Sequence, residues 1–481
     1  MKRLTGWDAF LLYSEAPNVH MHTLKIAIIE LVDMGGRSFG VEDFRRVLNA
    51  RLHKLYPLRY ELVDIPFKFH HPMWRENVHV DLDYHIRPLT LPAPGGRREL
   101  DDAIGQIAGT PLDRSRPLWE MYFIDGLADG RIAVVNKVHH ALADGVAAAN
   151  LLALGMDLQQ STPGDDGADQ ESYETDPAPT SFELVRSAFR DHFRHAAEIP
   201  STIGYTVAGI NRVRRSSRKL GPNLTMPFTP PPSFMNHMLT PERRFATASL
   251  SLDDIKETKN ALGVSINDLV LAMSAGALRK ASLRYDGHAD HPLLASVPVS
   301  FDFSSERISG NRFTGVMMPV HIDLADPLDR VRRTHEDAVL AKETNLLIGP
   351  ELVSRWSNYM PPAAMEALFR RLSRKDGQNK VLNLNISNVP GPRKYGRVGG
   401  ALVTEIYSVG PATTGSGINI TVWSYVDQLN ISVITDLKSV DDAHEITTAM
   451  VDELVEIRRA AGLSEKLTVV EKAMSPATRG I

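Results

Sequence analysis

The chain has 481 residues, of which 43% are hydrophobic and 23% are charged, and its formal net charge is −4. These values are ordinary for a globular protein, and the length predicts two or three domains. The acidic balance argues against a general nucleic-acid binder, and the lack of cysteine excludes disulfides, cysteine-ligated metals and a cysteine nucleophile.

Neither an export signal nor a membrane span is expected from the sequence. Asp8 and Glu15 interrupt the N-terminal region, so we expect no signal peptide. A membrane-spanning helix needs about 18 consecutive apolar residues, and no such run occurs. Together with the lack of cysteine, these features predict a cytoplasmic protein.

A first domain is predicted at residues 1–181, where strand-like and helix-like segments alternate. Branched apolar runs predict buried strands, and apolar residues at helical spacing predict helices. The strands are expected at 25–32 and 131–138, and the helices at 41–52 and 146–154. The last part, 158–181, includes six acidic and no basic residues between 165 and 176, which is typical of a solvated linker.

Residues 182–240 are predicted to be a crossover linker that begins with a basic amphipathic helix. Between residues 182 and 219 there are eight basic and three acidic residues. Apolar residues recur there at helical spacing, while arginines occupy another face of the helix. The apolar residues are Phe182, Val185, Phe189, Phe193 and Ala196, and the arginines are Arg186, Arg190 and Arg194. Such a helix is either a solvated face or a contact with an anionic lipid surface.

A second α/β domain is predicted at residues 241–481, again from alternating strand and helix patterns. Helices are expected at 251–262, 265–283 and 446–457, strands at 292–300, 315–322 and 381–387, and a hairpin at 417–435 that turns near Asp427. The whole pattern predicts a mixed α/β fold of two halves joined by a crossover.

A histidine pair, His139-His140, ends the strand predicted at 131–138, and Asp144-Gly145 opens the next helix. Successive strand residues point to opposite faces, so we expect one imidazole in a cleft and the other packed. A largely neutral imidazole can accept the proton of an attacking hydroxyl. We expect Asp144 to pair with an arginine and Gly145 to permit a sharp turn. A purely structural pair and a metal site remain alternatives, although adjacent strand histidines diverge.

Seven segments spread over most of the chain resemble the wax ester synthase/diacylglycerol acyltransferase family, within the chloramphenicol acetyltransferase-like superfamily. They are LTGWDA at 4–9, DLDYH at 81–85, PLWE at 117–120, HHALADG at 139–145, NDLVLA at 267–272, GNR at 310–312 and SNVPGP at 387–392. Any one of these segments is a weak signal, whereas their order and spacing make a strong one.

The resemblance implies two chloramphenicol acetyltransferase-like domains with an active-site tunnel between them. It implies transfer of an acyl group from acyl-CoA to diacylglycerol or a long-chain alcohol, giving triacylglycerol or wax ester, with no cofactor. His140 would be the general base, His139 would support it, and Asp144 would be structural. Because the substrates would be lipids, residues 182–219 could touch the inner face of a membrane or a lipid droplet.

Asn267 is a further catalytic candidate, because its amide could polarise a thioester carbonyl. The competing interpretation is local and structural. Ser265 and Asp268 have the spacing of a helix capping box, with serine at the N-cap and the acid three residues later.

Four residues are candidates for substrate binding, each beside a structural alternative. Trp119 precedes a strand-like run and could pack or touch substrate. Ser387 and Asn388 end a strand and could donate hydrogen bonds to an oxyanion or to CoA. Arg312 could pair with Asp144 or bind phosphate, and the sequence leaves both open.

Three other functions are compatible with parts of this sequence. A peptide-synthetase condensation domain or polyketide-associated acyltransferase shares the histidine motif, but its usual DFGWG loop is replaced here by GINIT at 417–421. A non-catalytic lipid-binding protein of the same fold and a metallohydrolase are the others. The chain has no Gly-x-Ser-x-Gly nucleophile elbow, which favours direct transfer over an acyl-enzyme.

Overall fold

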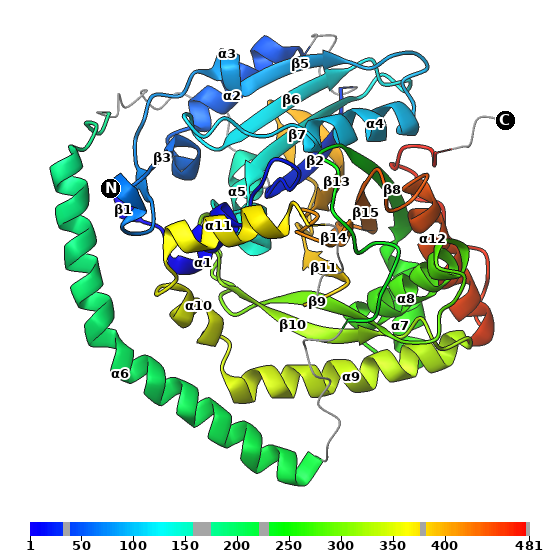
Figure 1. Ribbon diagram of the computed structural model, residues 1–481. Coiled ribbons are helices and arrows are strands. Elements are labelled where there is room, and N and C mark those ends of the chain that lie inside the picture. Colours follow the sequence, from blue (N-terminus) through cyan, green and yellow to red (C-terminus); the bar gives the residue numbers. More distant parts are fainter. Residues whose placement is uncertain (32–38, 157–174, 221–229, 376–380, 478–481) are drawn as a thin grey trace.

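The computed structural model describes residues 1–31, 39–156, 175–220, 230–375 and 381–477, and the side chains of 216–220 are not included. Most of the predicted acidic linker, residues 158–174, therefore lies outside the described residues. The described part consists mainly of two six-stranded sheets with helices packed on them (Figure 1).

The first sheet has the strand order β12-β13-β2-β7-β6-β5. Its strands are β2 (His22–Glu30), β5 (Ile86–Thr90), β6 (Trp119–Asp125), β7 (Ile132–His139), β12 (Arg397–Val398) and β13 (Ala401–Val409). One face packs on α4 (Arg97–Ala108). The other face packs on α2 (Val41–Arg51) and α5 (Gly145–Gly155).

The second sheet has the strand order β10-β9-β11-β14-β15-β8. Its strands are β8 (Arg243–Ser251), β9 (Leu293–Ser300), β10 (Phe313–Val320), β11 (Leu384–Pro390), β14 (Ile418–Tyr425) and β15 (Gln428–Asp436). The helices that accompany it are α7 (Leu252–Leu262), α8 (Ile266–Tyr285), α9 (Pro327–Ile348) and α12 (His444–Ala460). Residues from α7, α8, α9 and α12 share one apolar core with this sheet.

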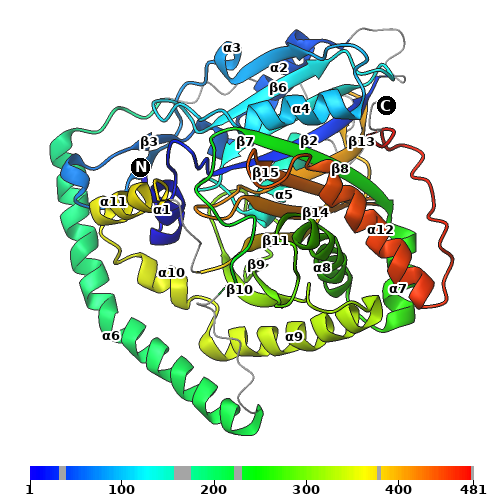
Figure 2. The same cartoon turned by 45° about the vertical axis from the view of Figure 1, so that its right-hand side comes forward.

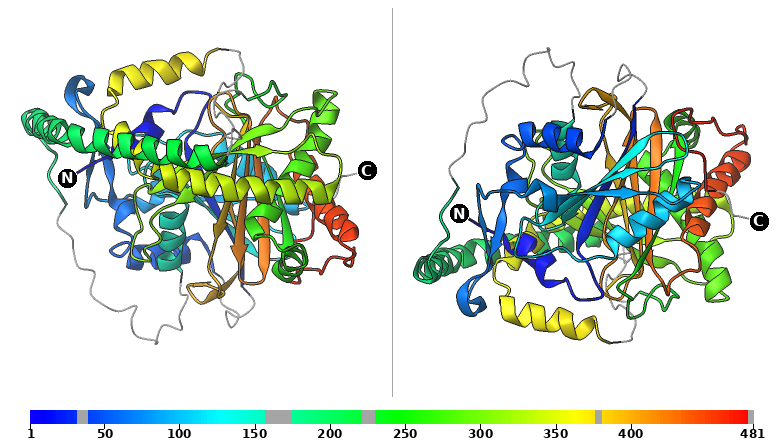
Figure 3. Two further views of the ribbon diagram at one scale, coloured as in Figure 1. Left: turned by 90° about the horizontal axis from the view of Figure 1, so that it is seen from below. Right: turned by 90° about the horizontal axis from the view of Figure 1, so that it is seen from above.

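The remaining elements lie around these two layers. They are β1 (Lys2–Arg3), β3 (Glu61–Val63), β4 (Met73–Arg75), α1 (Gly6–Tyr13), α3 (Leu82–His85), α6 (Ser181–Leu220), α10 (Leu352–Ser357), α11 (Pro362–Leu372) and two short 3-10 helices, Tyr56–Arg59 and Pro66–Lys68. The long helix α6 runs along the outside of the molecule (Figures 1 and 2). Seen from below, α6 and α9 run alongside each other across the same side (Figure 3).

The two halves exchange strands, which corrects a simple division of the chain at residue 241. β12 and β13 come from the C-terminal part of the sequence, but β13 pairs with β2 in the first sheet. The reason is burial, since almost every residue of β13 is buried and each face of the strand has its own core to fill. The second half therefore completes the first sheet.

The predicted two-part mixed α/β fold is confirmed, and the predicted segments appear as β2, α2, β7, α5, α6, α7, α8, β9, β10, β14, β15 and α12. The strand expected at 381–387 begins later, at Leu384. The shift has a local cause, because the Asn383 amide donates to Asn236 and to the Pro231 carbonyl, which anchors the chain before the strand.

Candidate active site

The two adjacent histidines face opposite sides of β7. His139 is fully buried, with its Nε2 3.7 Å from a carboxylate oxygen of Glu15 and its ring 6.1 Å from that of His22. Its Nδ1 accepts a hydrogen bond of 3.1 Å from the backbone N–H of Ala141. His140 follows the end of the strand, and its backbone N–H donates to the carbonyl of Met21 at 2.7 Å.

Asn311 fixes the orientation of the His140 ring. The Asn311 Nδ2 donates to Asp8 Oδ1 at 2.8 Å and to the His140 carbonyl at 2.9 Å, so its Oδ1 must face the imidazole. That Oδ1 lies 3.1 Å from His140 Nδ1. Since the carbonyl oxygen only accepts, this network assigns the proton to Nδ1 and leaves the lone pair of Nε2 available. His140 can thus accept a proton.

The surroundings keep His140 neutral at physiological pH. Its side chain is partly exposed, yet desolvation by the surrounding protein lowers the pKa of His140 below its ordinary value. The nearby Lys25 ammonium acts in the same direction, while Asp144 opposes it. Burial raises the pKa of Asp8, and hydrogen bonds from Thr5 and Asn311 oppose that rise.

Asp144 is a structural acid at the start of α5. Its Oδ1 accepts from the backbone N–H of Ala147 at 2.9 Å, which caps the helix, and from the Arg307 guanidinium at 3.0 Å. Its Oδ2 accepts from the backbone N–H of Arg312 at 2.8 Å. The arginine that pairs with Asp144 is therefore Arg307, and Arg312 contributes only its main chain to this acid.

Gly145 lies close to Val389 and takes no left-handed turn, which corrects the sharp turn expected from sequence. Its φ lies outside the left-handed region, whereas a Cβ at this position would come within 3.1 Å of a Val389 methyl at the end of β11. The left-handed glycine nearby is Gly310, with φ of 76°.

A short bridge joins the two halves at the histidine motif. The Gly310 N–H donates to the Leu142 carbonyl at 2.7 Å, and the Asp144 N–H donates to the Gly310 carbonyl at 3.2 Å. Gly310 belongs to the connection between β9 and β10 of the second sheet, whereas Leu142 and Asp144 follow β7 of the first sheet. The position of His140 therefore depends on both halves.

Trp119 is a packing residue in this structure, so the expected substrate contact is corrected. Its side chain is fully buried, stacks on His85 with ring centroids 4.3 Å apart, and donates from Nε1 to the Leu58 carbonyl at 2.8 Å. No surface of the indole is left to meet a ligand.

Asn267 lies in the first turn of α8, where the capping box takes the form expected from sequence. Ser265 accepts from the Asp268 N–H at 3.1 Å, and Asp268 accepts from the Ser265 N–H at 3.0 Å. Asp268 also contacts His335 of α9 at 2.8 Å. Within the described ranges, no hydrogen bond joins Asn267 to the His140 loop.

Ser387 and Asn388 project from opposite faces of β11. Asn388 shares a face with Ile386, which packs in the core of the second sheet. Ser387 shares the other face with Val389, the residue that meets Gly145. Of the two predicted donors, Ser387 is thus on the face of β11 that approaches the histidine motif.

Three residues with clear roles at His140 were not named as site residues from sequence: Asp8, Asn311 and Arg307. Asp8 and Asn311 do stand in two of the family-like segments, 4–9 and 310–312. Their meeting could not be read from spacing, since 303 positions separate them along the chain.

The structure bears on two features: a metal site and a membrane-spanning helix. In the part of the chain that the structure describes, no group of three or more histidine and acidic side chains is placed to hold a metal ion. No described helix is by itself long and apolar enough to cross a membrane, and only the pair α7 and α8, bent by 97°, meets that length and composition together.

A two-lobed α/β fold with a histidine at the junction of its lobes defines an acyltransferase of the chloramphenicol acetyltransferase-like class. Residues 4–270 match the model of the wax ester synthase/diacylglycerol acyltransferase catalytic domain, and residues 309–458 match that of the family's C-terminal domain. The chain therefore belongs to the wax ester synthase/diacylglycerol acyltransferase family.

Individual relatives agree with this assignment. A Mycobacterium tuberculosis protein named as a candidate diacylglycerol O-acyltransferase is 68% identical over 477 residues, covering 99% of this chain and all of the relative. The wax ester synthase/diacylglycerol acyltransferase from Marinobacter aquaeolei VT8 is similar in structure, with a TM-score of 0.67, 25% identity, and coverage of 96% of this chain and 100% of that one. The first condensation domain of the CDA synthetase shares the fold at 15% identity, with a TM-score of 0.56 and coverage of 97% and 98%.

Proposed function

We propose that this acyltransferase moves a fatty acyl group from acyl-CoA to the hydroxyl of diacylglycerol or of a long-chain alcohol, with His140 as the general base. Nε2 of His140 takes the hydroxyl proton while the oxygen forms a bond to the thioester carbonyl carbon. The tetrahedral intermediate then expels CoA as the carbon–sulfur bond breaks, and His140 returns the proton to the thiolate.

One observation supports the role of His140 above all others. Its Nδ1 is engaged by Asn311 at 3.1 Å, and Asn311 is in turn tied to Asp8, so the second ring nitrogen is free and oriented. A desolvated ring with a lowered pKa is the form that can accept a proton at neutral pH. The Asn311 oxygen would then stabilise the imidazolium as it forms.

Direct transfer without a cofactor is part of the same proposal. With no cysteine and no nucleophile elbow in the chain, a covalent acyl-enzyme has no obvious carrier. Among the predicted oxyanion donors, Ser387 is the best supported because it shares a face of β11 with Val389, against Gly145.

The test is to supply the purified protein with labelled palmitoyl-CoA together with diacylglycerol and hexadecanol, and to separate the lipid products. We expect labelled triacylglycerol, wax ester or both, with one molecule of free thiol released per ester formed. The matched control is His140→Ala, which should form either ester ~10²–10⁴ times more slowly. Ester formation at a near-normal rate in this variant contradicts the assignment of the base.

The outer face of α6 supports a contact with lipid surfaces. Seven large apolar side chains at helical spacing are exposed along it: Phe182, Phe189, Phe193, Ile199, Ile203, Val207 and Ile210. Beside them the ring of Phe69 packs 5.0 Å from that of Phe189, and Phe67 is 98% exposed on a backbone with φ of 58°. Large contiguous apolar surface of this kind is unusual on a protein that meets only water.

We infer that this face, together with exposed arginines, binds an anionic bilayer. Arg186, Arg190 and Arg194 follow one another at four-residue intervals and are all exposed. Each basic residue near an anionic surface contributes ~1 kcal/mol, and the apolar row adds the burial of its side chains. A lipid-consuming enzyme gains access to its acceptor in this way.

Vesicle flotation tests this contact. The protein should float with phosphatidylglycerol vesicles and much less with phosphatidylcholine vesicles, and Phe189→Ser with Phe193→Ser should abolish flotation. Val469→Ser is the matched control, because Val469 is 80% exposed but belongs to the C-terminal segment away from α6. Equal flotation of both variants contradicts the assignment of this face.

A further inference from the structure

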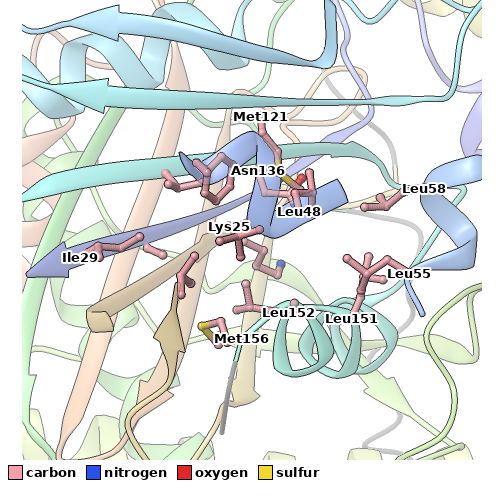
Figure 4. A pocket seen from close by; sticks show the side chains of 16 residues that line it. Lys25, Ile29, Leu48, Leu55, Leu58, Met121, Asn136, Leu151, Leu152 and Met156 are labelled. Atoms are coloured by element: carbon pink, nitrogen blue, oxygen red, sulfur yellow. The ribbon is translucent and has the colours of Figure 1, made fainter. Parts of the chain in front are cut away.

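The first half buries basic side chains in two different settings. Lys25 lies in the wall of an apolar cavity (Figure 4), and its ammonium donates to Ser408 Oγ at 2.7 Å within the same sheet. The second setting is where α6 packs on the segment before β4, and four histidines meet there: His70, His71, His192 and His195. Because these histidines belong to two different elements, a charge on them bears on how the two elements dock.

The N-terminal part of α6, residues 181–199, docks on the first half. Leu184 and Ala188 are buried there in a small apolar core against β4. Beside that core, Arg3 of β1 donates from Nε to Asp191 Oδ2 at 2.8 Å. A short apolar contact, one ion pair and the four histidines therefore hold this part of the helix in place.

Pro200 separates the N-terminal part of α6 from a second contact region. The C-terminal part packs on α9 and α10 of the second half, where Trp356 Nε1 donates to Thr206 Oγ1 at 3.0 Å and Arg212 Nε donates to the Leu347 carbonyl at 2.9 Å. A proline inside a helix removes one hydrogen bond of the helix, so the helix can bend at that point. The N-terminal part can therefore leave the first half while the C-terminal part stays docked.

His70 lies at the centre of the cluster, and its contacts fit only a neutral ring. Its ring centroid is 4.4 Å from that of His192 and 5.4 Å from that of His195, and its side chain is 3% exposed. Its Nδ1 accepts a hydrogen bond of 2.7 Å from the backbone N–H of His71. A protonated imidazole carries a hydrogen on both nitrogens, so a charged His70 would turn a donor towards that N–H and lose the bond.

The charges around the cluster also disfavour protonation of His70. The titratable and charged groups that surround it are Arg3 of β1, Tyr13 of α1, Asp64 and Lys68 before β4, Arg190, Asp191, Arg194 and Glu198 of α6, Tyr359 after α10 and Glu366 of α11. Burial, and then the charges of Arg3 and of the other three histidines, lower the pKa of His70 to about 2. Asp191 is already paired with Arg3 and Arg194.

We propose that the four histidines form a pH-sensitive latch, which holds the N-terminal part of α6 on the first half while they are neutral and releases it when they are protonated. In the released state His70 returns to an ordinary pKa of ~6.5, so the released form takes up a proton as pH falls below about 6.5 and the docked form does not. The docking equilibrium should therefore fall about 10-fold between pH 7.5 and pH 5.5 through His70 alone.

Release would change the surface that α6 presents. Leu184 and Ala188, which are buried in the docked helix, would join Phe182 and Phe189, which are already exposed. Acidification would thus add apolar surface to one part of the helix without unfolding either sheet. The latch does not depend on acyl transfer, because it concerns only the docking of α6.

Hydrogen–deuterium exchange of the full chain at pH 7.5, 6.5 and 5.5 tests the latch, after correction for the intrinsic exchange rate at each pH. Peptides from 184–198 report on the N-terminal part of α6, and peptides from 203–214 are the internal control, because that part docks through the contacts with α9 and α10. We expect protection in 184–198 to fall at least about 10-fold from pH 7.5 to 5.5, and protection in 203–214 to stay nearly constant.

Two substitutions of His70 preserve different parts of its environment. His70→Asn keeps an oxygen that can accept from the His71 N–H, whereas His70→Phe keeps a ring against His192. Neither side chain can be charged, so the loss of protection between pH 7.5 and 5.5 should be about 10-fold smaller in both variants. His53→Asn is the matched control, because His53 is exposed in the turn after α2, and this variant should behave like the unmodified protein.

The comparison within the unmodified protein is decisive without any variant. Protection in 184–198 that does not fall with pH overturns the proposal, as does an equal fall in 203–214, which would mean a general loss of stability in acid. A fall of unchanged size in both His70 variants overturns the role of this cluster.

Discussion

His139 and His140 are neighbours in sequence, but their surroundings differ in almost every respect. His139 is enclosed among Glu15, His22 and the main chain of Ala141, inside the first half alone. His140 is partly exposed and is held by Asn311, a residue of the second half. The alternation of a β-strand is sufficient to produce this difference, since one residue's step reverses the face.

The comparison shows how one motif can serve two purposes. The buried histidine accepts a hydrogen bond from the main chain of Ala141 and so stabilises the first half. The partly exposed one is oriented by a contact across the junction, which engages Nδ1 and leaves Nε2 available. The variants below are chosen to separate these two roles, beginning with the largest expected effect.

Removal of the proposed base should have the largest effect. We expect His140→Ala to lower the rate of acyl transfer by ~10²–10⁴, the usual contribution of a general base, while the melting temperature stays nearly the same. The rate is measured with saturating acyl-CoA and alcohol, and folding is followed by calorimetry. A near-normal rate in a folded variant means that another group takes the proton.

Loss of the Asn311 amide, which orients the His140 ring, should have the next largest effect. Asn311→Ala removes the partner of His140 Nδ1, and a hydrogen bond to a charged group contributes ~1.5–3 kcal/mol, so kcat should fall by roughly 10- to 100-fold. KM for acyl-CoA should change little. A loss confined to KM would place Asn311 in substrate binding and not in the orientation of the ring.

The substitution to compare with these is at the buried histidine, His139. His139→Leu should lower the free energy of unfolding by roughly 1–3 kcal/mol, because the buried Ala141 N–H loses its hydrogen-bond acceptor. Urea unfolding measures this change. The folded fraction should keep most of its activity. A loss of activity as large as that of His140→Ala would contradict a purely structural role of His139.

A change of pH should also lower the stability of the first half. Burial lowers the pKa of His20 to about 4 and that of His22 to about 3, so the unfolded chain binds protons near pH 6.5 that the folded chain does not. Stability should therefore fall as pH drops below about 6.5, by at most ~1.4 kcal/mol per pH unit for each histidine. Melting temperatures at pH 7.5 and 5.5 check this, and no decrease would mean that both rings take up protons in the folded chain as readily as in the unfolded chain.

Local features of this fold were predictable from sequence, whereas contacts between distant segments were not. The strand that ends in the histidine pair, the helix after Gly145 and the Ser265–Asp268 cap all follow from periodicity and capping chemistry. β13 could not be assigned to the first sheet, because its apolar residues are compatible with burial in either sheet.

In the candidate site, too, the contacts between distant segments could not be predicted from sequence. The pairing of Asp144 with Arg307 in place of Arg312 depends on how the connection between β9 and β10 bends at Gly310. Trp119 was ambiguous because an aromatic residue at a strand start can either pack or bind, and only its bond to Leu58 and its contact with His85 decide between the two.

The exchange of β13 into the first sheet has a consequence for biosynthesis. Until residue 409 has left the ribosome, β2 is an unpaired edge, and such edges invite association with other chains. The Gly310 bridge to the histidine loop likewise forms only after most of the polypeptide has been made. A nascent or truncated chain that lacks these segments therefore exposes an edge prone to aggregation and lacks the contacts that orient His140.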